Sequence, residues 1–134
     1  MKPVDQEFVH DPDNGVRGDC QRAVIASLME LPISEVPHFI EVANGDPSTY
    51  WDLLQAFCLS KGFVYLETKT TGNVWTGESD VDIYHEISGP SPRFSDVYHA
   101  VVGKNGQIVF DPHPSRAGLG GDPSNWVFAY LVKA

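Results

Sequence analysis

The fold of this chain is decided by the stretch Gly18-Asp19-Cys20-Gln21-Arg22-Ala23 and by the apolar run that follows it. From about Cys20 to Leu31 most side chains are apolar, which predicts a helix with little polar surface, buried at the centre of the molecule. Pro32 ends this helix, because proline cannot continue one. A cysteine at the start of a helix lies beside unpaired N–H groups and the positive end of the helix dipole, which favour a thiolate over a thiol.

The rest of the 134-residue chain places one more long helix before a series of strands. This helix is predicted from Ser48 or Thr49 to Lys61, and Gly62 ends it. Strand composition follows in five segments, which are Phe63 to Lys69, Val81 to Ile87, Tyr98 to Gly103, Gln107 to Asp111 and Trp126 to Lys133. Helices followed by strands is an α+β order, so we expect one α+β domain over residues 1–134, with the N-terminal helix packed on an antiparallel β-sheet.

His99 and Asp111 lie on the two arms of a predicted hairpin that turns at Lys104-Asn105-Gly106. A two-residue Asn-Gly turn would put these side chains on opposite faces, whereas a three-residue turn with a bulge at Gly106 would make them cross-strand neighbours. We favour the bulged turn, because it collects four apolar side chains on the other face, namely Ala100, Val102, Ile108 and Phe110.

Cysteine, histidine and aspartate in this order are the parts of a nucleophilic triad. Asp111 would hold the imidazole of His99 in one tautomer, and His99 would take the proton of the Cys20 thiol, which then attacks a carbonyl carbon. The backbone N–H of Cys20 would donate a hydrogen bond to the oxyanion that forms. Three side chains are candidates for a second donor, with Asn14 first and Gln6 and Gln21 after it.

These residues resemble the papain-like cysteine peptidase superfamily, most closely its double-glycine (bacteriocin-processing) peptidase-like branch. Cys20 matches the nucleophile at the start of the central helix. His99 in Tyr98-His99-Ala100-Val101-Val102 matches the base, and Asp111 in Val109-Phe110-Asp111-Pro112 matches the orienting carboxylate. The resemblance implies a papain-like fold and a catalytic triad. The chain differs at position 14, because the oxyanion residue of the family is Gln and this chain has Asn.

The chain also resembles small uncharacterised bacteriophage proteins, through segments such as Val36-Pro37-His38-Phe39 and Asp111-Pro112-His113-Pro114-Ser115. We expect a thiol-dependent hydrolase or acyl transferase, of the cysteine peptidase or amidase kind, that cleaves an amide, peptide or isopeptide bond without a cofactor. Its partner would be a peptide, a protein or a small amide substrate. The alternative is a noncatalytic phage-type protein that binds or inhibits a host protein on the same fold, with Cys20 buried and Asp111 turned away.

Composition narrows the partners and the compartment. The net charge of −9 argues against nucleic acid and anionic membranes, because affinity for phosphate comes mainly from Lys and Arg. The chain shows no secretory signal pattern and no apolar run of about 18 residues, so we expect a cytoplasmic protein, in the host cytoplasm if a phage encodes it. Both cysteines are expected to be reduced, with Cys58 a small core residue.

Four further residues are candidates for substrate binding, namely Arg93, Arg116, His113 and Trp75. The guanidinium groups of the two arginines suit a carboxylate or a phosphate. Together with His99 and Asp111, His113 would also suit Zn²⁺ or Fe²⁺. We rank this metal site third, because it leaves the cysteine at the helix start unexplained.

Overall fold

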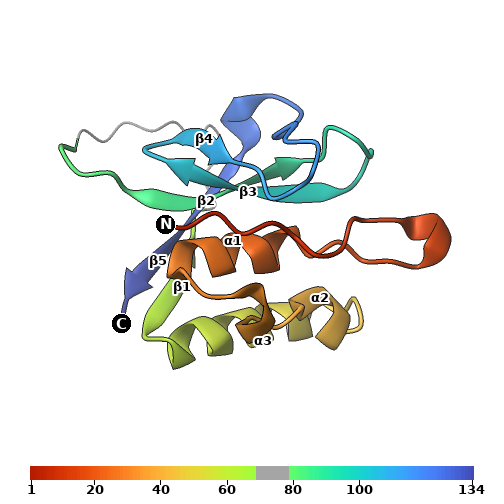
Figure 1. Ribbon diagram of the computed structural model, residues 1–134, viewed down its shortest axis with the longest axis horizontal. Helices are drawn as coiled ribbons and strands as arrows, with labels where there is room; N and C mark the ends of the chain where they lie inside the picture. Colours follow the sequence, from red (N-terminus) through yellow and green to blue (C-terminus); the bar gives the residue numbers. More distant parts are fainter. Residues whose placement is uncertain (69–78) are drawn as a thin grey trace.

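Helix α1, Cys20–Met29, is the central element of the fold (Figure 1). The computed structural model describes residues 1–68 and 79–134, and within them α1 lies between the sheet and the other two helices, α2 (Phe39–Val42) and α3 (Pro47–Ser60). Residues 23–26 of α1 are completely buried, as the apolar run predicts. The helix ends two residues early, because Glu30 is left-handed (φ 56°) and the N–H of Leu31 returns to the carbonyl of Ala26.

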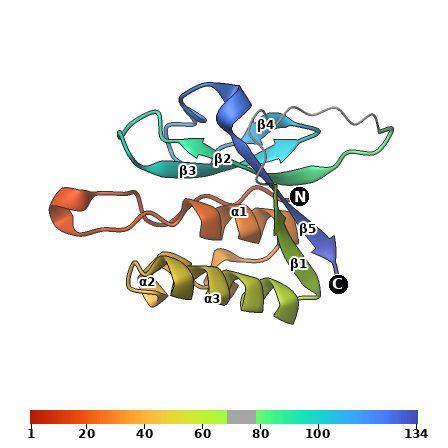
Figure 2. The same cartoon turned by 180° about the vertical axis from the view of Figure 1, so that it is seen from behind.

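The described strands form one antiparallel sheet in the order β1-β5-β2-β3-β4 (Figure 2). Their bounds are β1 Phe63–Glu67, β2 Tyr84–Pro90, β3 Tyr98–Lys104, β4 Gln107–Phe110 and β5 Val127–Lys133. The last strand, β5, pairs with both β1 and β2, so it joins the strand that follows α3 to the rest of the sheet. The α+β class with a helix packed on an antiparallel sheet is confirmed. Lys69, the predicted end of the first strand, lies outside the described residues.

Two apolar clusters hold α1 in place. Towards the sheet, Val24 packs with Ala100 and Val102 of β3. Towards the other helices, Ile25 shares a buried cluster with Cys58 of α3. Cys58 is a free and fully buried cysteine, as expected of a small core residue. Packing on both sides fixes the position of the first residue of α1 relative to β3.

The β3–β4 hairpin does not have the predicted three-residue turn. Lys104 pairs with Gln107, so the turn consists of Asn105 and Gly106, and both have a positive φ (49° and 82°), as a type I′ turn requires. The pairing then shifts by one residue between 103 and 102 of β3, which leaves Val109 of β4 as the extra residue of a β-bulge.

A two-residue turn alone would put positions 99 and 111 on opposite faces of the hairpin, and the bulge brings them back to the same face. Before the bulge, Ile108 pairs with Gly103 and packs with Ile87 and Val101, not with Ala100 and Val102 as predicted. After the bulge, Val102 pairs with Phe110. Continuing this shifted register by one residue brings position 111 to the same face of the hairpin as position 99. One extra residue in β4 therefore decides that the two proposed triad members can meet.

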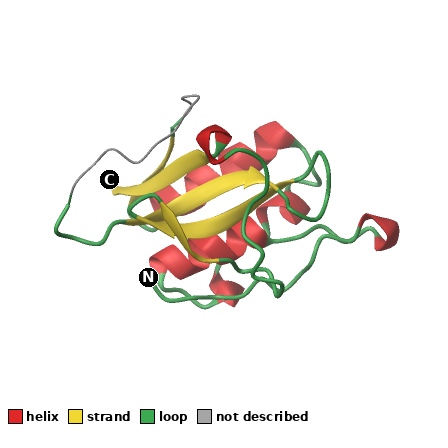
Figure 3. Cartoon of the chain, turned by 90° about the horizontal axis from the view of Figure 1, so that it is seen from above, coloured by secondary structure: helices red, strands yellow, loops and turns green. Residues whose placement is uncertain are grey.

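The N-terminal residues run as an extended arm along α1 (Figure 1). The N–H of Val4 donates to the hydroxyl of Ser27 in α1 (2.9 Å), and the N–H of Gln6 donates to the carbonyl of Pro112, after β4 (3.1 Å). Residues 11–16 then fold back through a bridge between Asp11 and Val16, and their tip projects away from the helices and the sheet (Figure 3). The arm is thus held between α1 and the segment that follows the hairpin.

In the part of the chain that the structure describes, no single helix has the length and apolar character needed to span a membrane. Within residues 1–68 and 79–134, one pair of segments meets that criterion together, α1 and Ile33–Val42, and the two are bent by 104° relative to each other.

Candidate active site

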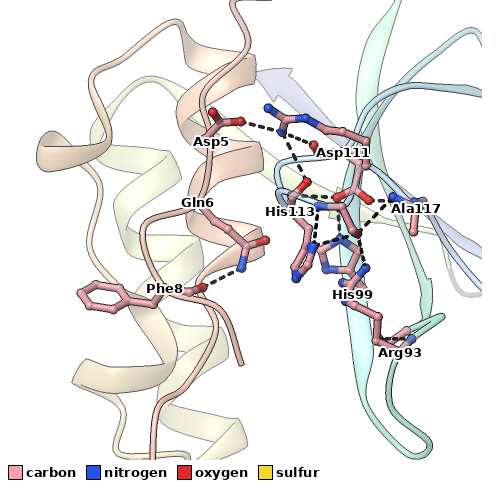
Figure 4. Close-up of polar contacts among 12 residues, drawn as sticks. Asp5, Gln6, Phe8, Arg93, His99, Asp111, His113 and Ala117 are labelled. Carbon is pink, nitrogen blue, oxygen red and sulfur yellow. Dashed lines mark hydrogen bonds and ion pairs between the residues drawn. The ribbon is translucent and has the colours of Figure 1, made fainter. Parts of the chain in front are cut away.

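A pocket of about 410 Å³ lies at the N-terminal end of α1. One wall comes from the N-terminal arm and the first residue of α1, and the other comes from residues 91–99 and the loop after β4 (Figure 4). Cys20 and His99 both line this pocket, and Asp111 is buried next to His99. The structure therefore brings together the three residues that the sequence predicts as a triad.

The contact between His99 and Asp111 is the most closely defined part of the site. His99 Nε2 lies 2.7 Å from Asp111 Oδ1, and both side chains are buried. Asp111 also accepts hydrogen bonds from the backbone N–H groups of His113 (2.9 Å) and Gly118 (2.7 Å). Burial by itself would raise the pKa of Asp111, but these three hydrogen bonds hold the pKa below its usual value. Asp111 is therefore an oriented carboxylate beside His99.

Cys20 is the second hydrogen-bond partner of the His99 imidazole. Because Nε2 of His99 is bonded to Asp111, Nδ1 is the nitrogen that remains for the sulfur. Burial by itself would lower the pKa of His99, but hydrogen bonds with Asp111 and Cys20 outweigh it and raise the pKa to about 9. Cys20 is partly exposed and begins α1, where the N–H groups have no acceptor within the helix. A charged imidazole between a carboxylate and a sulfur can activate a nucleophilic thiol.

Asp19 ties the N-terminal arm to the start of α1. Its buried carboxylate accepts hydrogen bonds from the N–H groups of Glu7 (3.3 Å) and Phe8 (2.8 Å). Gln6, which comes directly before these two residues, lines the same pocket as Cys20. Asp19, the residue before the proposed nucleophile, thus holds the N-terminal arm beside Cys20 in the same wall of the pocket.

The three amide side chains considered as oxyanion donors lie in different places. Asn14 is exposed at the tip of the projecting loop, where its amide donates to Asp11 (2.7 Å), so the structure corrects the assignment of Asn14. Gln21 turns away from the pocket and donates to buried side chains of β1 and β2. Of these three amides, Gln6 is the one that lines the pocket.

Asn14 is closer to Cys20 along the sequence than Gln6 is, which made it the first candidate donor. In the folded protein Gln6 lines the pocket and Asn14 does not. The residues Pro12 to Asn14 form a 3-10 turn at the tip of the loop, which carries Asn14 outward. On either side of the loop the chain comes together again, because the N–H of Asp19 bonds to the carbonyl of Phe8 (3.3 Å). The turn-forming residues at positions 11–15 are the sequence signal that could have identified Gln6.

The two arginines proposed for substrate binding have different surroundings. Arg116 lies 4.9 Å from the ring centre of Phe110, pairs with Asp5 (2.6 Å) and donates to the carbonyl of Asp111 (2.6 Å). These contacts hold the loop after β4 in place, and Arg116 does not line the pocket. Arg93 lines the pocket, donates to Ser115 (3.0 Å) and forms no ion pair within residues 1–68 and 79–134. Trp75, the remaining candidate of this kind apart from His113, lies outside the described residues.

The metal interpretation receives no support from the geometry. Among the described residues, no group of three or more His, Cys, Asp or Glu side chains is arranged to hold a metal ion. Asp111 already accepts three hydrogen bonds, and Nδ1 of His113 bonds to Ser115 (2.8 Å). The carboxylate of Asp111 and Nδ1 of His113 are therefore engaged by protein partners, which leaves Nε2 of His113 as a single unengaged nitrogen among the proposed ligands in the described part of the chain.

No family model, no curated protein and no solved structure matches this chain. The functional conclusion is therefore drawn from the contacts of the pocket itself.

Proposed function

We propose that this protein is a thiol-dependent hydrolase or acyl transferase that cleaves an amide, peptide or isopeptide bond through Cys20, His99 and Asp111, on a papain-like fold. The observation that carries the proposal is the bond between His99 Nε2 and Asp111 Oδ1, which leaves Nδ1 for a cysteine at the start of the buried helix. The packing of that helix on a sheet that carries the histidine supports the papain-like interpretation.

The reaction follows from the positions of these groups. His99 holds the proton that Cys20 has given up, and the thiolate attacks the carbonyl carbon of the substrate, which forms an S–C bond and a tetrahedral oxyanion. The backbone N–H of Cys20 donates to that oxyanion. When the oxyanion collapses, the C–N bond breaks and His99 gives its proton to the departing amine. Water, or a second amine in a transferase, then attacks the thioester while His99 accepts a proton, and the S–C bond breaks, which releases the acid or the new amide and returns the Cys20 thiolate.

The contacts favour this function over a purely noncatalytic binding protein. A binder that keeps only the fold has no need for an accessible thiol or for an oriented carboxylate. Here Cys20 is partly exposed, and Asp111 faces His99 with three hydrogen bonds holding it there. The two backbone bonds orient Asp111, and its bond with His99 Nε2 orients the imidazole, which a binding surface does not require.

The proposal is tested by the rate of Cys20 alkylation with iodoacetamide, measured from about pH 5 to about pH 9 in a Cys58→Ala background. We expect the wild-type thiol to react at about pH 6 at least tenfold faster than a free cysteine, because the imidazolium stabilises the thiolate, and we expect His99→Ala to abolish that advantage. Equal rates in wild type and His99→Ala across this range would refute the proposed function.

A further inference from the structure

We propose that His113 is the side-chain donor to the oxyanion, through its Nε2–H group, and that it completes the site formed by the backbone N–H of Cys20. This inference rests on the proposed thiol chemistry and adds to it a residue that the triad does not contain. Three observations carry it, namely the tautomer of His113, the unpartnered state of its Nε2 and its place in the pocket.

The tautomer follows from the contacts of Nδ1. The backbone N–H of Ser115 donates to Nδ1 of His113 (3.0 Å), and the hydroxyl of Ser115 lies 2.8 Å from the same atom. A nitrogen that accepts from a backbone N–H carries no proton of its own. The proton of the neutral imidazole is therefore on Nε2, so that Nε2–H is a donor.

This donor is buried and has no partner. The His113 side chain is nine-tenths buried, and Nε2 forms no hydrogen bond within the described residues. Buried polar groups in proteins are nearly always paired, so an unpaired one in the wall of a pocket points to a ligand group that completes it. His113 lines the pocket that holds Cys20 and His99, and its ring centre is 6.1 Å from that of His99 (Figure 4).

Gln6 does not supply this donor in its observed orientation. Its Nε2 donates to the carbonyl of Phe8 (2.6 Å), and exchanging the amide nitrogen and oxygen would set two oxygens against each other at that distance. The buried atom that remains without a partner is Oε1, which is an acceptor. Among the buried side-chain nitrogen and oxygen atoms of the described residues, the two without a partner are a donor on His113 and an acceptor on Gln6, and the C=O and N–H of an amide need such a pair.

The surroundings of His113 keep its donor in the neutral form. Burial lowers the pKa of His113, and the nearby charge of Arg93 lowers the pKa further. Arg93 Nη1 donates to the hydroxyl of Ser115 (3.0 Å), and that hydroxyl contacts His113 Nδ1. Two adjacent histidines thus have different roles: His99 is charged and moves protons, whereas His113 is neutral and donates a hydrogen bond without releasing its proton.

The test compares two reactions of Cys20 in the same variants. Acylation by p-nitrophenyl acetate passes through a tetrahedral oxyanion: the S–C bond forms, the C–O bond to the aryl group breaks, and p-nitrophenolate leaves. Alkylation by iodoacetamide is a direct displacement of iodide and forms no oxyanion. A residue that stabilises the oxyanion affects the first reaction and spares the second.

For His113→Phe we expect acylation to fall about 10- to 100-fold while alkylation stays within about twofold of wild type. His113→Gln, which restores an amide N–H close to the position of Nε2, should recover most of the lost rate. The matched control is His38→Phe, because Nδ1 of His38 also accepts a backbone N–H (3.4 Å) but its Nε2 bonds to the carbonyl of Arg17 (3.0 Å), and His38 itself does not line the pocket. This control should leave both rates within about twofold.

Equal losses in acylation and alkylation would overturn the proposal, because they would make His113 a support for Asp111 and His99 only. Unchanged acylation in His113→Phe would overturn it as well. Failure of the underlying thiol chemistry looks different, because wild type itself would then lack rapid alkylation near pH 6.

Discussion

Cys20 and Gln21, the first two residues of α1, belong to two polar clusters whose buried carboxylates have opposite pKa shifts. Cys20 faces the pocket with His99 and Asp111. Gln21 faces the interior, where its amide donates to the hydroxyl of Tyr65 (3.0 Å) and to both oxygens of Glu86 (3.1 and 3.3 Å). We call Gln21, Tyr65 and Glu86 the interior cluster. Each cluster contains a buried carboxylate, Asp111 beside the pocket and Glu86 in the interior cluster, but only Asp111 is paired with a histidine.

The difference lies in the partners of each carboxylate. Asp111 accepts two backbone N–H groups and pairs with a charged imidazole, which together hold its pKa low despite burial. Glu86 has only the neutral donors Gln21 and Tyr65 and forms no ion pair within the described residues. Burial is therefore the dominant influence on Glu86, and it raises the pKa to about 7. The pKa shifts are opposite because desolvation outweighs the two neutral partners of Glu86, whereas the histidine and the two backbone N–H groups outweigh desolvation at Asp111.

The largest effect should come from removing the sulfur on the pocket side. In Cys20→Ala the release of p-nitrophenolate from p-nitrophenyl acetate should fall by about 10⁴-fold or more, to the rate without protein, because no other group in the site forms the thioester. Stopped-flow absorbance measures the burst of p-nitrophenolate that acylation of Cys20 releases. Cys58→Ala is the control and should keep the full burst, since Cys58 is buried in the core. A burst that survived in Cys20→Ala would place the reaction elsewhere.

Exchanging the carboxylate of each cluster for an amide tests the comparison directly. In Asp111→Asn an amide NH₂ would face one of the N–H donors, and His99 would lose its fixed tautomer, so acylation of Cys20 should slow by about 10²- to 10⁴-fold. The same change in the interior cluster, Glu86→Gln, should leave the acylation rate within about twofold. Comparable losses in both variants would mean that the two clusters act as one site.

The interior cluster should instead control the pH dependence of stability. Glu86 titrates at about 7 in the folded protein and near its ordinary value of about 4.5 when unfolded, so the folded state binds more protons between these values. The contribution of Glu86 to stability is therefore fully present below about pH 4.5 and is lost as the pH rises to 7.

Glu86→Gln removes this titration. Its unfolding free energy relative to wild type should rise by about 3 kcal/mol between pH 4 and pH 8, as measured by urea denaturation at several pH values. A difference that stays constant across this range would show that Glu86 ionises normally inside the fold.

The smallest effect concerns the Tyr65 hydroxyl of the interior cluster, which accepts from Gln21 and donates to Glu86. Tyr65→Phe removes the hydroxyl that donates to Glu86 (3.1 Å) and should reduce the unfolding free energy by about 1 kcal/mol. Alkylation of Cys20 should not change. Tyr84→Phe, at a partly exposed position, is the control and should stay within about 0.5 kcal/mol of wild type. A loss of thiol reactivity in Tyr65→Phe would show that the two clusters are coupled across the first turn of α1.

The amino-acid sequence by itself determined the elements and their class. The apolar run after Cys20 specifies a buried helix wherever it is placed, because almost every face of that helix must avoid water. The strand segments of the second half are recognisable from composition, and their starts and ends lie within about three residues of the predicted ones where the structure describes them. The order of Cys20, His99 and Asp111 along these elements was also readable, because each lies at or near an element boundary.

Only the tertiary structure decided how these residues meet. The sequence Asn105-Gly106 suits both turns that were considered, and the extra residue that aligns Asp111 with His99 is Val109, whose side chain carries no bulge signal. The loop at residues 11–16 projects outward, so Gln6 reaches the pocket and Asn14 does not. The tautomer of His113 depends on Ser115 in the loop after β4. Local patterns fix helices and strands because hydrophobic periodicity is a property of neighbouring residues, whereas register, loop direction and tautomer depend on partners that only the folded chain brings into contact.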